Sequence, residues 1–312
     1  MKSSNVGGQA VMEGIMMRNG DKYAVAVRKE NQEIEVKAET YTGFIKNRKL
    51  LKLPFIRGAF NFIDSMVLGM KSLNYSASFF MEEEEKEQEK KRSERNKNIM
   101  MGLTMVFSIV LSIGLFMILP YALASLLRQL TTSAAIVAIA EGILRLALFI
   151  GYIALISQMK DIRRVFMYHG AEHKCINCIE HGYELTIENV MKSSKQHKRC
   201  GTSFLLFVMI ISIILFFFIR VESPLWRVLV RVLLMPVIAG ISYEFIRLAG
   251  RTENKFIEFL SKPGLWMQEL TTREPDVDMA EVAIRAVEAV FSWKDYLNEN
   301  FGTNYDRTGE QK

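Results

Sequence analysis

Four long apolar segments constrain this chain more than any other feature of its sequence. "IMMGLTMVFSIVLSIGLFMILPYALASLL" has no charged residue, and three later segments are also strongly apolar. A helix needs about 20 mainly apolar residues to cross a bilayer, and a soluble core rarely contains four such runs. We therefore predict a polytopic, mainly α-helical membrane protein with four spans, at Ile99–Leu127, Ala134–Ile156, Ser203–Ile219 and Leu225–Gly250.

The basic residues outside the spans predict how the chain is oriented. Spans one and two, and spans three and four, are joined by short segments, whereas the segment between spans two and three is long and rich in Lys and Arg. Basic residues also cluster just before the first span. The positive-inside rule then places the N-terminus, the central segment and the C-terminus in the cytoplasm.

The net charge of +6 is compatible with either anionic lipid or nucleic acid as a partner. Because no base-reading motif is present, we predict membrane lipid as a partner and no nucleic acid.

The parts outside the spans predict a small β region and several amphipathic helices. "YAVAVRK" and "QEIEVKAET" alternate on either side of a polar turn, which indicates a β-hairpin. Leu53–Phe80 has helical spacing but is too polar to span, so we expect a helix that lies on the membrane or packs on the other helices. In the tail we expect a turn at Pro263-Gly264 and a last helix capped by Asp278.

These boundaries divide the chain into six segments. They are a β-rich cytoplasmic segment (1–52), an amphipathic helix with a charged linker (53–98), spans one and two (99–156), a cytoplasmic His/Cys segment (157–202), spans three and four (203–250) and C-terminal cytoplasmic amphipathic helices (251–312).

All four histidines and all three cysteines fall between residues 169 and 200, which makes this segment the candidate site. His169 and His173 stand four apart with Glu172 between them, in the order H-x-x-E-H. On a helix both imidazoles would project from one face, one turn apart, and could share one metal ion. In H-x-x-E-H enzymes the glutamate acts as the base, so Glu172 is the predicted catalytic residue.

Three further residues are candidates to complete the metal shell. His197 and Cys200 come just before the third span, and a short helix capped by Thr186 would turn the chain back toward the first pair. Glu244 is an acid near the cytoplasmic end of the fourth span, where it needs a cation or a paired charge. An ion pair with Arg247 or Arg145 is the structural alternative. For the C-x-x-C pair, Cys175 and Cys178, we favour two small residues on a helix face over a redox or metal pair.

Four motifs in order give the chain a resemblance to a known family. "GGQAVMEGIMMR", "YHGAEHK", "HKRCGTSFLLF" and "PGLWMQELTTREP" resemble the YqhQ family, and the resemblance covers nearly the whole chain. The family consists of bacterial membrane proteins of unknown function that are predicted to be metal-dependent enzymes. The resemblance therefore implies a bacterial cytoplasmic (inner) membrane location. The chain departs from the family pattern at Ile187, where relatives have Pro, and at Lys198.

Three functional interpretations remain open. The first is a metal-dependent enzyme, such as a hydrolase, that uses zinc or another divalent metal at the cytoplasmic membrane face. The second is a non-catalytic scaffold or assembly factor for a translocase, protease or biogenesis complex, with a structural metal or none; a shell closed by His169, His173, His197 and Cys200 would favour it. The third, a transporter using Glu141, Arg145, Glu244 and Arg247, is disfavoured because no inverted repeat is visible.

Overall fold

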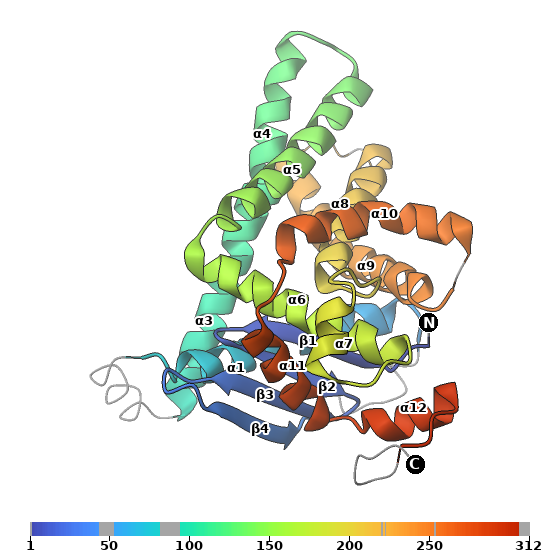
Figure 1. The fold of residues 1–312 in the computed structure, drawn as a ribbon. Helices are drawn as coiled ribbons and strands as arrows, with labels where there is room; N and C mark the ends of the chain where they lie inside the picture. Colours follow the sequence, from blue (N-terminus) through green and yellow to red (C-terminus); the bar gives the residue numbers. More distant parts are fainter. Residues whose placement is uncertain are drawn as a thin grey trace.

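A computed structural model describes residues 2–43, 53–81, 94–219, 221, 223–252 and 254–305. Helices predominate, and a single four-stranded sheet precedes them. Figure 1 shows the sheet with α6, α7 and α11 at one end of the molecule and the α4–α5 hairpin at the other. The predicted fold class is confirmed. Most of the predicted charged linker, residues 82–93, lies outside the described residues.

The N-terminal sheet is an antiparallel meander in the order β1-β2-β3-β4. Its strands are β1 (Val6–Val11), β2 (Gly14–Asn19), β3 (Lys22–Arg28) and β4 (Ile34–Thr40). The predicted hairpin is β3–β4. The glycine-rich motif before it adds β1 and β2, which are joined by a two-residue turn between the paired Val11 and Gly14.

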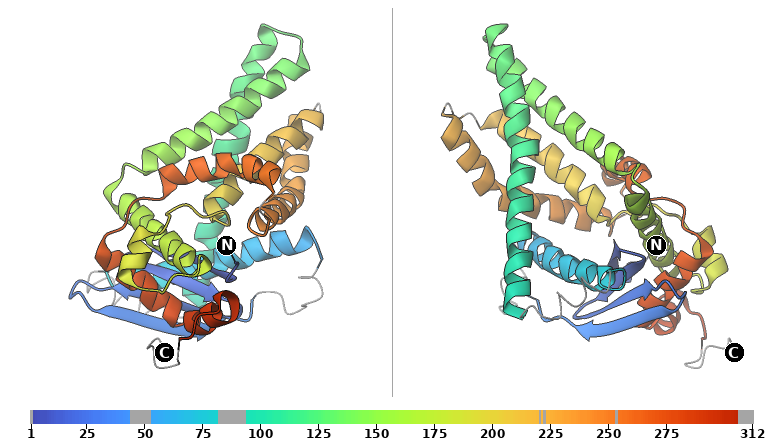
Figure 2. Two further views of the ribbon diagram at one scale, coloured as in Figure 1. Left: turned by 45° about the vertical axis from the view of Figure 1, so that its right-hand side comes forward. Right: turned by 90° about the vertical axis from the view of Figure 1, so that its left-hand side faces the viewer.

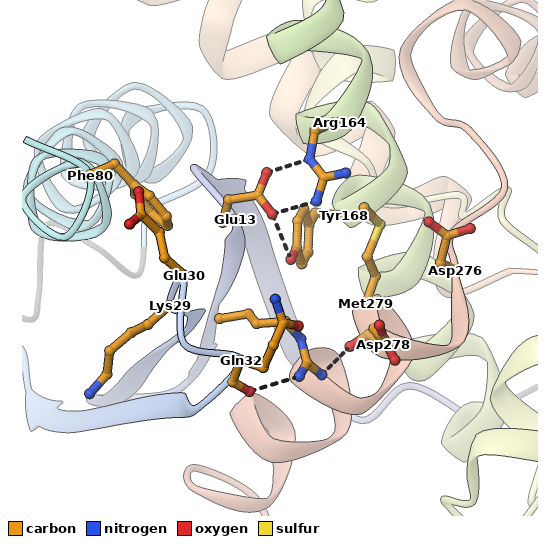
Figure 3. A pocket seen from close by; sticks show the side chains of 11 residues that line it. Glu13, Lys29, Glu30, Gln32, Phe80, Arg164, Tyr168, Asp276, Asp278 and Met279 are labelled. Carbon is orange, nitrogen blue, oxygen red and sulfur yellow. Dashed lines mark hydrogen bonds and ion pairs between the residues drawn. The ribbon is translucent and has the colours of Figure 1, made fainter.

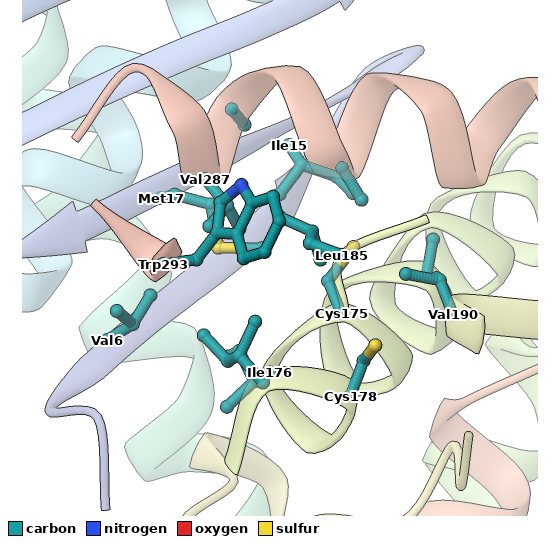
Figure 4. Close-up of a cluster of buried hydrophobic side chains, with 14 of the residues drawn as sticks. Val6, Ile15, Met17, Cys175, Ile176, Cys178, Leu185, Val190, Val287 and Trp293 are labelled. Carbon is teal, nitrogen blue, oxygen red and sulfur yellow. The ribbon is translucent and has the colours of Figure 1, made fainter. Parts of the chain in front are cut away.

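Both faces of this sheet are buried, so it forms the middle layer of a three-layer unit. Ile15, Met17 and Ala24 face one core, which includes α6 (Lys160–Glu180), α11 (Val277–Glu288) and α12 (Trp293–Phe301). Figure 4 shows this core, with Trp293 and Val287 over Met17. Met16, Tyr23 and Val25 alternate with those residues and face Leu68 of α1 (Ile56–Ala77). Because side chains on a pleated strand alternate between the two faces, burial of both faces explains the continuous apolar runs Ile15–Met17 of β2 and Tyr23–Val27 of β3.

Cys175 and Cys178 are both buried free thiols in this core (Figure 4). They behave as small apolar residues, in agreement with the interpretation favoured from the sequence.

Four helices are long and apolar enough to cross a membrane: Ile99–Gln129, Ala134–Ile156, Gly201–Phe218 and Trp226–Ala249. The first comprises α3 (Glu94–Ile113), the π-helical η2 (Gly114–Ile118), α4 (Leu119–Ser125) and the 3-10 turn η3 (Leu126–Gln129), and the others are α5 (Ala134–Ile156), α8 (Gly201–Phe218) and α9 (Pro224–Ala249). The chain does not end its helix at Pro120. The π-helical turn just before it absorbs the missing N–H and the steric clash that a proline causes.

A buried ion cluster joins two of these helices. Glu141 of α5 accepts hydrogen bonds from Arg145 on the same helix, at 2.7 Å, and from both terminal nitrogens of Arg231 on α9. All three side chains are less than 10% exposed. Ser212 of α8 also accepts from Arg145, at 3.3 Å. Glu141, one of the two acids considered for a transport path, is therefore paired with two arginines.

Helix α1 packs against α9 through two glycines. A Cβ at Gly58 would lie 3.0 Å from the Cα of Gly240. Helix α1 thus packs on another helix, and it also exposes the apolar Ile56, Ile63 and Met66, so both positions expected from the sequence for this amphipathic helix remain compatible with the structure.

The tail differs from expectation at two positions. Pro263 and Gly264 do not form a turn but lie inside α10 (Lys255–Thr271), where Gly264 packs against Ser203 of α8. The N-cap of α11 is Asp276, not Asp278, and its side chain makes no capping hydrogen bond. The helix continues through Pro263-Gly264 because Gly264 packs closely on Ser203 of α8. This long-range contact could not be predicted from the local sequence.

Candidate metal centre

Helix α6 carries the candidate site and is almost entirely buried from Tyr168 onward. It begins after a break at Ser157–Met159 that separates it from α5. After α6 the chain forms α7 (Ile187–Lys192), where the Thr186 side chain accepts from the N–H of Asn189 as the sequence predicted. The chain then runs back along α6 to Cys200, the N-cap of α8.

Three side chains of this region converge on one point. One donor atom each from His169, His173 and Cys200 lies within 4.8 Å of the others. The Sγ of Cys200 lies 3.3 Å from Nε2 of His169, and the His169 and His173 ring centroids are 4.4 Å apart. In a tetrahedral zinc site, neighbouring ligand atoms are about 3.3–3.6 Å apart. The Cys200–His169 distance matches this spacing, and the three donor atoms are close enough together to make these residues candidate metal ligands.

The other nitrogen of each imidazole is held by a backbone carbonyl. Nδ1 of His169 lies 2.8 Å from the carbonyl oxygen of Thr271, and Nδ1 of His173 lies 2.6 Å from that of Lys195. A carbonyl can only accept, so each Nδ1 carries a proton. The raised pKa of His169 means that its Nε2 also carries a proton, which it shares with Cys200 and would give up on binding a metal; the neutral ring is then protonated at Nδ1 alone. This is the tautomer that a metal ligand requires.

The surroundings of Cys200 favour the thiolate form of its side chain. Burial would raise the pKa of its thiol, but His169 and His173 outweigh burial and hold the pKa well below its usual value. The N–H of Thr202 donates to the sulfur at 3.4 Å, at the N-terminus of α8. Conversely, burial would lower the pKa of His169, whereas the Cys200 sulfur and the Glu172 carboxylate raise it to about 9. A thiolate is the form that binds metal.

Glu172 lies beside these three residues and is 5% exposed. Burial raises the pKa of its carboxyl group, against the lowering effect of His169 and His173. Strand β1 approaches it closely, because a Cβ at Gly8 would lie 3.0 Å from the Glu172 carboxyl carbon. The glycine motif at the N-terminus and the H-x-x-E-H motif therefore meet at this carboxylate.

The two other predicted ligands do not join the three-residue group. His197 is buried, and its Nε2 lies 3.4 Å from Glu180 at the end of α6. Burial lowers the pKa of His197. Glu244 pairs with Arg57 of α1, and neither Arg247 nor Arg145 is its hydrogen-bonded partner among the described residues.

Polar side chains of α6 that the sequence analysis did not single out hold the returning segment in place. Lys174 donates to the carbonyl oxygens of Met191 and Ser193, at 2.9 and 2.8 Å. Asn177 donates to those of Ser194 and Gln196, at 2.7 and 2.8 Å. Asn177 and Glu180 stand four and seven residues after His173, so helical spacing from the motif is the signal that points to them.

Glu180 is fully buried and holds three parts of the chain together. Its carboxylate accepts from the backbone N–H and hydroxyl of Ser4, at 2.7 and 2.8 Å, and from Arg199. This fixes the N-terminus and the segment just before Cys200 to the end of α6.

The segment after α10 crosses α6 at Gly170. The N–H of Arg273 donates to the carbonyl of Phe166 at 2.9 Å, and a Cβ at Gly170 would overlap the Arg273 carbonyl oxygen. This crossing brings the carbonyl of Thr271 to His169 and Glu274 to within 3.0 Å of Lys174. It explains why "YHGAEHK" and "TTREP" occur together.

The comparisons with known proteins agree with these motifs. The sequence profile of a family described as "Protein of unknown function (DUF1385)" matches residues 53–293. The chain belongs to the DUF1385 family. It is also 38% identical over 288 residues to "Uncharacterized protein YqhQ" of Bacillus subtilis (strain 168), covering 90% of each chain. The resemblance to the YqhQ family is thus confirmed. No solved structure matches this DUF1385 protein.

A cavity of about 500 Å³ in this DUF1385 protein is lined by Arg164 and Tyr168, which precede the three candidate ligands along α6. Figure 3 shows Glu13, from the β1–β2 turn, facing Arg164 and Tyr168 of α6, with Asp276 and Asp278 across from them. Glu13 forms an ion pair with Arg164 and accepts from the Tyr168 hydroxyl at 3.3 Å. Glu13 therefore binds the first half of α6, not the metal-ligand group.

Proposed function

We propose that this chain is a membrane-embedded, metal-dependent enzyme, a hydrolase in the first instance, whose site is formed by His169, His173, Cys200 and Glu172. The observation that carries the proposal is the convergence of three donor atoms within 4.8 Å, with both imidazoles locked in the ligand tautomer by backbone carbonyls. Surface histidines that merely share a helix face have no need of such locks.

The donor set fits zinc. Two imidazole nitrogens and one thiolate are the mixture that zinc accepts in tetrahedral sites, and harder cations such as magnesium prefer oxygen. A bound zinc would supply Lewis-acid chemistry and lower the pKa of a water molecule.

The chain's own residues would then have separate roles in the reaction. Thr271 and Lys195 orient the two imidazoles through their carbonyls. Glu172, buried beside them with a raised pKa, is placed to take a proton from the nucleophile and return it to the leaving group. Strand β1, at Gly8, covers the carboxylate and keeps bulk water away from it.

The number of protein ligands favours catalysis over a structural staple. Structural zinc sites have four protein ligands, whereas catalytic sites have three and leave a position for water or substrate. His197 would be the fourth ligand of a closed shell, but its Nε2 lies beside Glu180, and its ring centroid is 5.7 Å from that of His173, against 4.4 Å between His169 and His173. The scaffold interpretation, in which this protein partners another membrane complex, rests on no comparable contact.

Metal analysis of the detergent-purified protein tests the proposal. We expect about one zinc per chain, lost in His169→Ala, His173→Ala and Cys200→Ala. His181→Ala is the matched control, because His181 is an exposed histidine at the end of the same helix. Protein that contains no metal even after expression in zinc-supplemented medium would overturn the proposal.

A second variant separates enzyme from scaffold. Glu172→Gln is expected to keep the zinc and to lose hydrolysis of chromogenic ester, peptide and phosphodiester probes by 100-fold or more, on the order of a lost general base. Equal hydrolysis by Glu172→Gln and the unaltered protein would remove Glu172 from the mechanism and leave a structural metal.

A further inference from the structure

Helix α10 presents three different faces to its surroundings. Its buried face consists of Ser261, Gly264, Met267, Gln268 and Thr271, and it packs mainly on α8. A second face is apolar and exposed, and a third is charged. An ordinary surface helix has only a buried face and a polar face, so the exposed apolar face needs an explanation.

The exposed apolar face is a stripe of large residues. Phe256, Phe259 and Trp266 are 67%, 63% and 56% exposed, and with Pro263 they recur at i, i+3, i+7 and i+10. Such spacing puts them on one side of the helix. Aromatic residues are typical of the membrane–water interface, and tryptophan most of all.

The charges beside this stripe favour an anionic surface. Both acids of the helix bind protein: Glu258 lies 3.5 Å from Lys198, and Glu269 lies 3.2 Å from Lys195. Lys255 and Lys262 are exposed, and neither forms an ion pair with another residue in the described part of the chain. Two unpaired cations next to an aromatic stripe complement the phosphates of an anionic leaflet.

The position of α10 agrees with this assignment. Figures 1 and 2 show α10 lying across α8 and close to the point where α5 gives way to α6. Helix α8, on which α10 packs, is itself long enough to span, so α10 lies beside a candidate membrane-spanning helix. A helix that lies across the ends of spans, apolar on one side and charged on another, matches an interfacial helix.

We propose that α10 is an interfacial helix whose Phe256, Phe259 and Trp266 insert into the headgroup region of an anionic leaflet, with Lys255 and Lys262 at the phosphates. This inference is independent of the proposed enzymatic function.

The same placement sets the depth of the candidate metal centre. Thr271, whose carbonyl holds His169, comes five residues after Trp266 on the same helix. At 1.5 Å per residue this is about 7.5 Å of helix rise. Since Thr271 belongs to the buried face of α10, the His169, His173 and Cys200 group would lie on the protein side of this helix, about one helix diameter of 10 Å from the headgroups.

The three tryptophans of the chain make the test internally controlled. Trp226 is 60% exposed near the start of the α9 span, Trp266 lies on the stripe, and Trp293 is 6% exposed in the core next to the sheet. Three single-tryptophan variants, made by Trp→Phe changes at the other two positions, are reconstituted in vesicles with lipids brominated at different depths of the acyl chain.

We expect the Trp266 variant to be quenched most by lipids brominated close to the headgroup, and the Trp293 variant to be quenched by none. Trp266 fluorescence that is insensitive to all brominated lipids but sensitive to aqueous iodide would overturn the proposal. Strongest quenching by lipids brominated near the bilayer centre would also overturn it.

The anionic preference has its own measurement. At equal mole fraction, brominated phosphatidylglycerol should quench Trp266 more than brominated phosphatidylcholine, because each lysine enriches anionic lipid by roughly five-fold. Lys255→Gln/Lys262→Gln should remove this difference, whereas Lys22→Gln, an exposed lysine on β3, should leave it unchanged. An unchanged preference in the double variant would show that these lysines do not select anionic lipid. Since the hydrogen bond of His173 goes to Lys195 and not to α10, the quenching pattern of His173→Ala should match that of the unaltered protein even if no metal is bound.

Discussion

Two adjacent glycines in the N-terminal motif meet very different surroundings. A Cβ at Gly8 would lie 2.7 Å from the Met16 carbonyl oxygen and 3.0 Å from the Glu172 carboxyl carbon, whereas a Cβ at Gly7 would meet nothing within 4 Å. We expect Gly8→Ala to destabilise the protein by about 1–3 kcal/mol through overpacking and to displace Glu172. Gly7→Ala is the control and should be close to neutral. Thermal unfolding in detergent, together with probe hydrolysis, checks the pair; equal effects of the two changes would contradict the close approach of β1 to Glu172.

A second residue-scale prediction concerns acid stability. Burial would raise the pKa of Glu180, but its hydrogen bond to His197 and the charge of Arg199 lower it below the ordinary 4.5. The unfolded chain then binds more protons than the folded one, so the stabilisation is complete above about pH 4.5 and is lost as the pH falls through the folded pKa.

Glu180→Gln should therefore lower stability at pH 7, by about 3 kcal/mol or more because a buried ion pair is broken. The variant should also lose less stability than the unaltered protein between pH 5 and pH 3. Melting curves across this range test both statements, and parallel pH profiles for the two proteins would exclude Glu180 as the source. Glu188→Gln is the control, because Glu188 is an exposed acid on α7.

The residues that converge on the metal centre were only partly accessible from the sequence. His169, His173 and Cys200 could be predicted because local helix geometry and a nearby turn suffice to bring them together. Thr271 and Gln268 could not, because they come from a helix about 70 to 100 residues later that is positioned by packing on α8. Glu244 illustrates the same limit: its partner Arg57 lies 187 residues away, and sequence proximity pointed to Arg247.

At the element scale, patterns of period and composition were the reliable guides. The four spans match expectation within a few residues, because their apolar runs exceed any ordinary helix. The β1–β2 pair was harder to foresee, since glycines at Gly7, Gly8 and Gly14 interrupt the pattern of this segment. Pro263-Gly264 misled for a physical reason: these residues break helices in isolation, yet here Gly264 allows close contact with Ser203.

The charge cluster between α5 and α9 yields a prediction about these two elements. Glu141 pairs with two buried arginines and offsets one of their two charges, so Glu141→Gln should leave Arg145 and Arg231 without a counter-charge at a cost of about 3–5 kcal/mol. The triple change Glu141→Leu/Arg145→Leu/Arg231→Leu removes every charge and should be far less harmful. Thermal stability and monodispersity in detergent distinguish the two variants. If the triple variant were less stable than Glu141→Gln, the packing and hydrogen bonds of these side chains would stabilise the protein more than the pairing of their charges.

At the scale of the whole molecule, the two ends of the described chain lie on the same side. The Tyr296 hydroxyl donates to the carbonyl of Lys2 at 2.6 Å, and the N–H of Lys2 donates to Glu180 at the end of α6. An even number of spans returns the C-terminal part of the chain to the side of the membrane on which the chain began. An odd number would place the N-terminal and C-terminal parts of the three-layer unit on opposite sides. The sheet, α6, α11 and α12 must then share one compartment, since they form one core.

The charges near the ends of the spans predict the compartment in which this unit lies. The segment between α5 and α8 carries Lys160, Arg163 and Arg164 directly after the second span, whereas the short connection after α4 has Arg128 as its basic residue. The positive-inside rule therefore predicts that the three-layer unit is cytoplasmic.

Labelling with a membrane-impermeant maleimide tests this topology, because the three native cysteines are buried and should stay unreactive. Thr131→Cys, in the α4–α5 connection, should label in intact cells, and Thr303→Cys only after the membrane is permeabilised. The opposite pattern would reverse the topology and place the candidate metal centre outside the cytoplasm, where a reduced Cys200 would be much harder to maintain.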